Sequence, residues 1–79
     1  MGNNKITLEY NTSNLNVFYH QIIEKIFEQN NLNIENYDYN ISIDEKSNYP
    51  LYDIKEMNIE INSIIELEDE IIVEYLFKK

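Results

Sequence analysis

Apolar and polar residues follow simple periods along most of the chain. From Lys5 to Tyr10 they alternate, with Ile6, Leu8 and Tyr10 on one side and polar side chains on the other. An alternation of this kind is typical of a strand that is buried on one face only. The first element expected is therefore a half-buried strand.

The next segment changes to a helical period. Residues Asn11 to Asn14 offer polar N-cap side chains, and Asn30 and Asn31 are suited to the left-handed backbone that closes a helix. Between them the apolar residues recur every three or four positions, at Leu15, Phe18, Tyr19, Ile22, Ile23, Ile26 and Phe27. This spacing predicts an amphipathic helix.

Alternation returns from Tyr37 to Ile43 and from Met57 to Ile61, which predicts two more one-sided strands. The run from Ile71 to Phe77 is apolar on both faces, as in a central strand. The segment from Glu45 to Glu56 is interpreted as a loop or short edge strand, because Pro50 cannot donate a hydrogen bond to a sheet.

Together these elements predict a single small α+β domain over residues 1–79. One amphipathic helix would pack on one face of a mostly antiparallel sheet of about four strands, in the order strand, helix, strand, strand, strand.

The segment from Ile64 to Val73, with Asp69 and Glu70 before the closing strand, resembles the end of ubiquitin-like β-grasp domains. The chain departs from that family because no hairpin precedes the helix and Lys78 and Lys79 stand in place of a Gly-Gly tail.

Charge changes this picture more than composition does. The richness in Asn, Ile and Tyr is typical of an AT-rich genome, but the same bias would favour Lys, and the 79 residues hold only 6 basic against 15 acidic residues. The net charge of −9 is therefore a property of the protein itself. Such a surface repels nucleic acid and anionic membranes and favours basic surfaces. Acidity that merely keeps a small protein in solution is the alternative.

Chemical groups are scarce. The sequence holds no Cys and a single His, so a thiolate zinc site and a Cys nucleophile are excluded, and one Gly cannot form a phosphate-binding loop. His20 is expected on the rim of the helix with Glu24 one turn later, making a local contact. The residues after Asp44 fail the calcium-loop pattern because Tyr49 occupies the Gly position. No enzymatic activity, metal or cofactor is expected.

Two acidic regions remain as candidate partner-binding surfaces. One is the turn before the last strand, and the other is the outer face of the sheet, where an apolar centre would be surrounded by carboxylates. A segment from Tyr49 to Ile54 folded over that centre is the alternative. The loop tyrosines are added because exposed Tyr is enriched at interfaces. The candidate residues are Glu66, Glu68, Asp69, Glu70, Asp38, Asp44, Glu60, Glu74, Ile72, Leu76, Tyr49 and Tyr52.

These features favour a non-enzymatic inhibitor or adaptor that docks on a basic, nucleic-acid-binding surface of another protein. Small acidic proteins of phages and mobile elements that block CRISPR or restriction enzymes are similar in size and charge. The alternative is an assembly module that forms a homodimer or joins a larger complex. Direct nucleic-acid binding and membrane binding are not expected, and the expected location is the cytoplasm of the source or an infected host cell.

Overall fold

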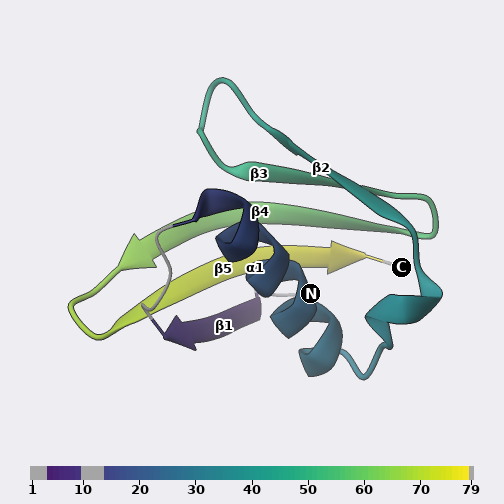
Figure 1. Cartoon of the computed structure of the whole chain (residues 1–79), viewed down its shortest axis with the longest axis horizontal. Helices are drawn as coiled ribbons and strands as arrows, with labels where there is room; N and C mark the ends of the chain where they lie inside the picture. The colour runs from purple at the N-terminus through teal and green to yellow at the C-terminus, as the bar shows by residue number, and fades with distance from the viewer. Residues whose placement is uncertain (1–3, 10–13, 79) are drawn as a thin grey trace.

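The computed structural model describes residues 4–9 and 14–78. Within them one α-helix packs on a five-stranded antiparallel sheet, which confirms the predicted α+β class and adds a fifth strand (Figure 1). The elements are β1 (Asn4–Glu9), α1 (Leu15–Gln29), the short 3-10 helix η1 (Ile34–Asn36), β2 (Tyr39–Ile43), β3 (Pro50–Ile54), β4 (Met57–Glu66) and β5 (Glu70–Lys78). The strands lie in the order β1-β5-β4-β3-β2, so β1 and β2 form the two edges.

The helix begins and ends with asparagine, as predicted. The Asn14 side chain accepts a hydrogen bond from the backbone N–H of Val17 at 3.3 Å, and Asn31 has the left-handed φ of 60° just beyond the helix. The apolar stripe is buried from Tyr19 to Phe27. Leu15 departs from the prediction: it is 64% exposed and lines, together with Ile43, an open hollow at the start of the helix. Tyr10 and the predicted cap residues 11–13 lie outside the described residues.

The structure predicted for the segment with Pro50 was wrong. This segment forms β3, which pairs with β2 on one side and β4 on the other, rather than a loop or an edge. Pro50 is the first residue of β3, and the pairing of β3 with β4 begins only at Tyr52. The missing N–H of Pro50 therefore falls where no ladder bond to β4 is made.

A β-bulge divides β4. The pairing with β5 shifts between Ile61 and Ser63, so that Asn62 is an extra residue on the β4 side. Ile59 and Ile61 face the helix before the bulge, and Ile64 faces it after the bulge although its parity is opposite. Alternation predicted β4 only as far as Ile61 because the bulge interrupts the period there.

The core lies between α1 and the inner face of the sheet. Its fully buried members include Ile22, Ile23 and Ile26 of the helix and Val73 and Tyr75 of β5. Figure 1 shows α1 crossing one face of the sheet. In the described residues no helix is long and apolar enough to cross a membrane.

Candidate docking surface

The outer face of the sheet is open. No described helix or strand covers it, and β3 lies within the sheet, so the alternative in which the segment from Tyr49 to Ile54 hides Ile72 and Leu76 is wrong. Ile72 and Leu76 of β5 are half-buried between their neighbouring strands. Ile65 of β4 lies opposite Ile72 and is 43% exposed, and Leu51 of β3 is 47% exposed. Apolar side chains are therefore accessible across three adjacent strands.

Carboxylates separate these apolar positions. Glu60 of β4 lies opposite Leu76. Glu74, between Ile72 and Leu76 along β5, is held on both sides: its Oε1 accepts a hydrogen bond from Ser63 Oγ at 2.8 Å, and its Oε2 lies 3.7 Å from Lys5 Nζ. Lys5 is well exposed, so this ion pair contributes little stability but fixes the Glu74 carboxylate in place.

One end of the sheet is more acidic than the prediction had it. Glu9 of β1 lies directly opposite Glu70 of β5, which adds Glu9 to the acidic turn. Like charges at directly opposite positions of an antiparallel pair are destabilising. Glu68 and Asp69 form the exposed tip of the β4–β5 hairpin. Glu66 lies opposite the buried Ile71, so its side chain is on the helix side of the sheet. The acidic groups surround the hairpin instead of sharing one face.

Two predicted acidic residues flank β2. Asp38 is exposed just before the strand, and Asp44 follows it. The Asp44 carboxylate accepts hydrogen bonds from the backbone N–H of Lys46 and from Ser47 Oγ, both at 3.1 Å. This Asx turn, together with Asn48 at a φ of 63°, sets the β2–β3 connection. Asp44 thus has a structural role as well as its charge.

The two loop tyrosines differ from each other. Tyr49 is half-buried at the end of the β2–β3 turn. Tyr52 was expected in a loop but is 7% exposed on the inner face of β3, where its hydroxyl donates to the Tyr19 carbonyl oxygen at 2.6 Å. Tyr52 is therefore a core residue and is removed from the docking surface. Its burial, and secondarily the nearby Tyr19 and Tyr39 phenols, raises the pKa of Tyr52 strongly.

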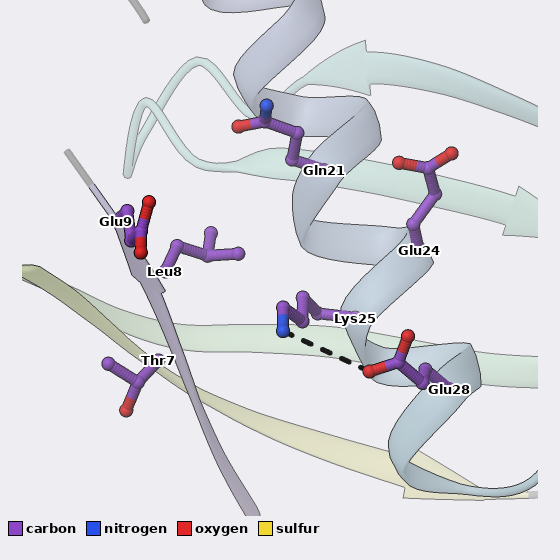
Figure 2. A pocket seen from close by; sticks show the side chains of 7 residues that line it. All are labelled: Thr7, Leu8, Glu9, Gln21, Glu24, Lys25 and Glu28. Carbon is purple, nitrogen blue, oxygen red and sulfur yellow. Dashed lines mark ion pairs between the residues drawn. The ribbon is translucent and has the colours of Figure 1, made fainter. Parts of the chain in front are cut away.

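The structure also shows a groove that the sequence did not predict. A hollow of about 510 Å³ lies between β1 and the exposed flank of α1. Figure 2 shows Lys25 reaching into it from the helix toward β1, while Thr7 points away and Leu8 points toward the helix. Lys25 Nζ lies 3.9 Å from Glu28 Oε1. The lining residues are Thr7, Leu8, Glu9, Gln21, Glu24, Lys25 and Glu28.

His20 lies at the other side of the helix. Its Nδ1 is 2.8 Å from the Tyr39 hydroxyl of β2, with the two rings in an edge contact. The contact is therefore with a strand 19 residues further along the chain, and not the local contact that the sequence predicted. Burial, and secondarily the Glu24 carboxylate, raises the pKa of Tyr39. The pair joins the helix to the β2 edge of the sheet.

A further feature of the described residues is the distribution of their possible metal ligands. No group of three or more His, Asp or Glu side chains among them could hold a metal ion. The groove beside β1 is lined mainly by charged and polar side chains. The outer face carries a smaller hollow of about 160 Å³ lined by Asn58, Glu60, Leu76 and Lys78. The chain matches no protein-family model, no curated protein and no solved structure.

Proposed function

We propose that this protein is a non-enzymatic inhibitor or adaptor whose open, acidic sheet face docks on a basic surface of a partner protein. The observation that carries the proposal is the composition of that face. Ile65, Ile72 and Leu76 are accessible on it, and Glu60 and Glu74 lie among them. Apolar contacts would supply affinity, while the carboxylates would select a partner whose Lys and Arg residues surround an apolar centre.

The total charge supports the same partner class. A net charge of −9 on 79 residues attracts basic surfaces over a distance of about a Debye length and accelerates encounter. Basic surfaces of this kind are typical of proteins that bind nucleic acid. The proposed partner is therefore a nucleic-acid-binding protein, of the kind that phage and mobile-element anti-defence proteins such as anti-CRISPRs block, met in the cytoplasm.

The test compares the native chain with a charge-reversed variant. Glu60, Glu70 and Glu74 of the outer face and Glu68 of the hairpin tip are changed together to Lys, and partners are captured from an extract of the source or host cell at low and high salt. The native chain should retain a basic protein at low salt, lose it steeply as salt rises, and lose it to added duplex DNA. The variant should retain none.

A matched control separates a specific surface from net charge alone. Changing Glu24, Glu35, Glu45 and Glu56 to Lys alters the charge by the same amount at exposed positions away from the hairpin. This control should retain most of the binding. Equal loss in both variants, or binding that is insensitive to salt, overturns docking through the acidic face. A concentration-dependent homodimer in sedimentation with no captured protein would favour the assembly module instead.

A further inference from the structure

The two edges of the sheet differ in the backbone groups that they leave open. At the β2 edge, the Asp44 N–H donates to the Tyr49 carbonyl oxygen at 2.9 Å, which makes this a hydrogen-bonded pair. Hydrogen-bonded and non-hydrogen-bonded pairs alternate along an antiparallel ladder. Asn40 and Ser42 therefore direct their backbone groups to β3, and Tyr39, Ile41 and Ile43 direct theirs away from the sheet.

The β1 edge is covered by side chains. The Leu67 N–H donates to the Glu70 carbonyl oxygen at 2.8 Å, and the same alternation across β5 leaves Lys5, Thr7 and Glu9 pointing outward on β1. Gln29 Nε2 of the helix donates to the Lys5 carbonyl oxygen at 2.9 Å. Charged side chains and an adjacent helix are means by which proteins block an edge from pairing.

The β2 edge is less protected: α1 contacts the Tyr39 side chain through His20, and Asp38 and Asp44 stand just outside the strand. Tyr39–Ile43 contains no charged residue and no proline, and its pairing with β3 is regular. Ile41 is half-buried and Ile43 is 45% exposed, so apolar surface lies next to the outward backbone groups. An uncharged, regular edge of β-forming residues is a template for an additional strand.

We infer that β2 receives an extended segment of a partner protein as a sixth, antiparallel strand. The backbone of such a segment would hydrogen-bond to Tyr39, Ile41 and Ile43. Its apolar side chains would lie opposite these residues, on the face of the sheet that the helix covers. Basic residues at its two ends would lie opposite Asp38 and Asp44, which share the other face. The partner is thus a strand of alternating apolar and polar residues with Lys or Arg at both ends.

Charge excludes a second copy from the same pairing. If β2 paired fully with β2 of a copy, each Asp38 would face an Asp44, and like charges would meet at both ends of the new ladder. The net charge of −9 on each chain adds to this repulsion. With a partner strand that has basic ends, the local repulsion at Asp38 and Asp44 and the long-range repulsion between the chains are both replaced by attraction.

This site is separate from the outer-face docking proposed above and does not depend on it. The probe is a peptide of alternating valine and threonine with lysine at both ends, and the control peptide carries glutamate at both ends. Titration of the labelled protein followed by NMR should shift the amide signals of Tyr39, Ile41 and Ile43 with the lysine peptide and weakly or not at all with the glutamate peptide. Changing Glu60 and Glu74 to Lys should leave these local shifts in place.

Proline variants test the backbone pairing directly. Ile41→Pro removes a donor that faces outward, so the fold should persist while peptide affinity falls at least about ten-fold. Ile43→Pro repeats the test at a more exposed residue if Ile41→Pro fails to fold. Asp38→Lys keeps the edge intact and should weaken the lysine peptide by about two- to five-fold at low salt.

Three results overturn the inference. One is the absence of shifts at β2 with millimolar lysine peptide, and another is undiminished binding by a folded proline variant. The third is a homodimer of the native chain that either proline variant abolishes, since this would make a second copy the occupant. Failure of the native chain to capture a basic protein in the outer-face experiment, with peptide binding retained at β2, would reject the proposed function alone.

Discussion

Three tyrosine hydroxyl groups fasten the helix to the sheet at separate points. Tyr52 of β3 donates to the Tyr19 carbonyl oxygen, and Tyr39 of β2 meets His20. At the other end of α1, the Tyr75 hydroxyl donates to Gln29 Oε1 and accepts from Asn30 Nδ2 at 3.2 Å. A helix that crosses a sheet obliquely is thus tied to β2 and β3 near its start and to β5 at its end.

Alkaline pH should lower the free energy of unfolding through Tyr52. Burial raises the pKa of Tyr52 above its ordinary value of 10, so the unfolded chain loses this proton first as pH rises. The associated stability is fully present below pH 10 and decreases above it by about 1.4 kcal/mol per pH unit. Urea unfolding at a series of pH values should show this decrease for the native chain and a shallower one for Tyr52→Phe. Equal slopes would contradict it.

The sequence predicted the strands of two of these tyrosines but not the partners of their hydroxyl groups. Parity with Ile and Val predicted that Tyr75 and Tyr39 belong to strands, and the structure confirms this. Their hydroxyl partners were not predictable, because they come from a helix distant in sequence. Tyr52 was misplaced because Pro50 two residues earlier argued against a strand.

At the element scale, β4 depends on one inserted residue. Asn62 lets Ile61 and Ile64 both face the helix and lets Ile65 face out beside Ile72. Local pattern could not predict this, since a bulge is defined by the register with a partner strand. Part of the docking surface, the Ile65 contribution, therefore remained unseen in the sequence.

Deleting Asn62 should cost much more than substituting it. The deletion forces one side of β4 to reverse its faces or to keep a strained ladder, so we expect a loss of at least about 2 kcal/mol. Asn62→Ala keeps the residue count and should lose less than about 1 kcal/mol. Urea unfolding of both variants measures the difference. A deletion no more harmful than the alanine variant would show that the register adjusts freely.

The ends of the helix lack charges that would favour its dipole. No acidic residue lies in the first turn of α1 and no basic residue in its last turn, although Asn14 provides a cap. Asn14→Ala should lower stability by about 1 kcal/mol, because a backbone N–H loses its partner. Asn16→Glu should raise it by about 0.3–1 kcal/mol through the dipole. Thermal unfolding of the two variants should move in opposite directions.

At the scale of the whole molecule, acidity opposes stability. Glu9 and Glu70 face each other across β1 and β5, and the chain carries 15 acidic against 6 basic residues. The sequence predicted the excess charge and the acidic turn. It could not predict that Glu9 would join that turn, because their proximity arises only from pairing of the first and last strands.

Glu70→Lys should separate stability from binding. The change replaces a like-charge pair with an opposite-charge pair, so the free energy of unfolding should rise by about 0.2–1 kcal/mol at low salt. Partner capture should fall, because a carboxylate of the acidic hairpin is lost. Unfolding and capture measured on the same preparation decide this. If the variant gains stability without losing the partner, Glu70 has no part in docking.

The pairing of β1 with β5 also determines when the protein can fold. Asn4 lies opposite Tyr75, so β1 meets its neighbour β5 only after the helix and the other strands of the sheet have been synthesised. Until then β1 has no ladder partner, and the sheet that α1 covers lacks the Val73 and Tyr75 part of its core. Long-range pairings of this kind slow folding, since the closure of a large loop precedes the contacts that reward it. On the ribosome, the fold is therefore completed by its last strand.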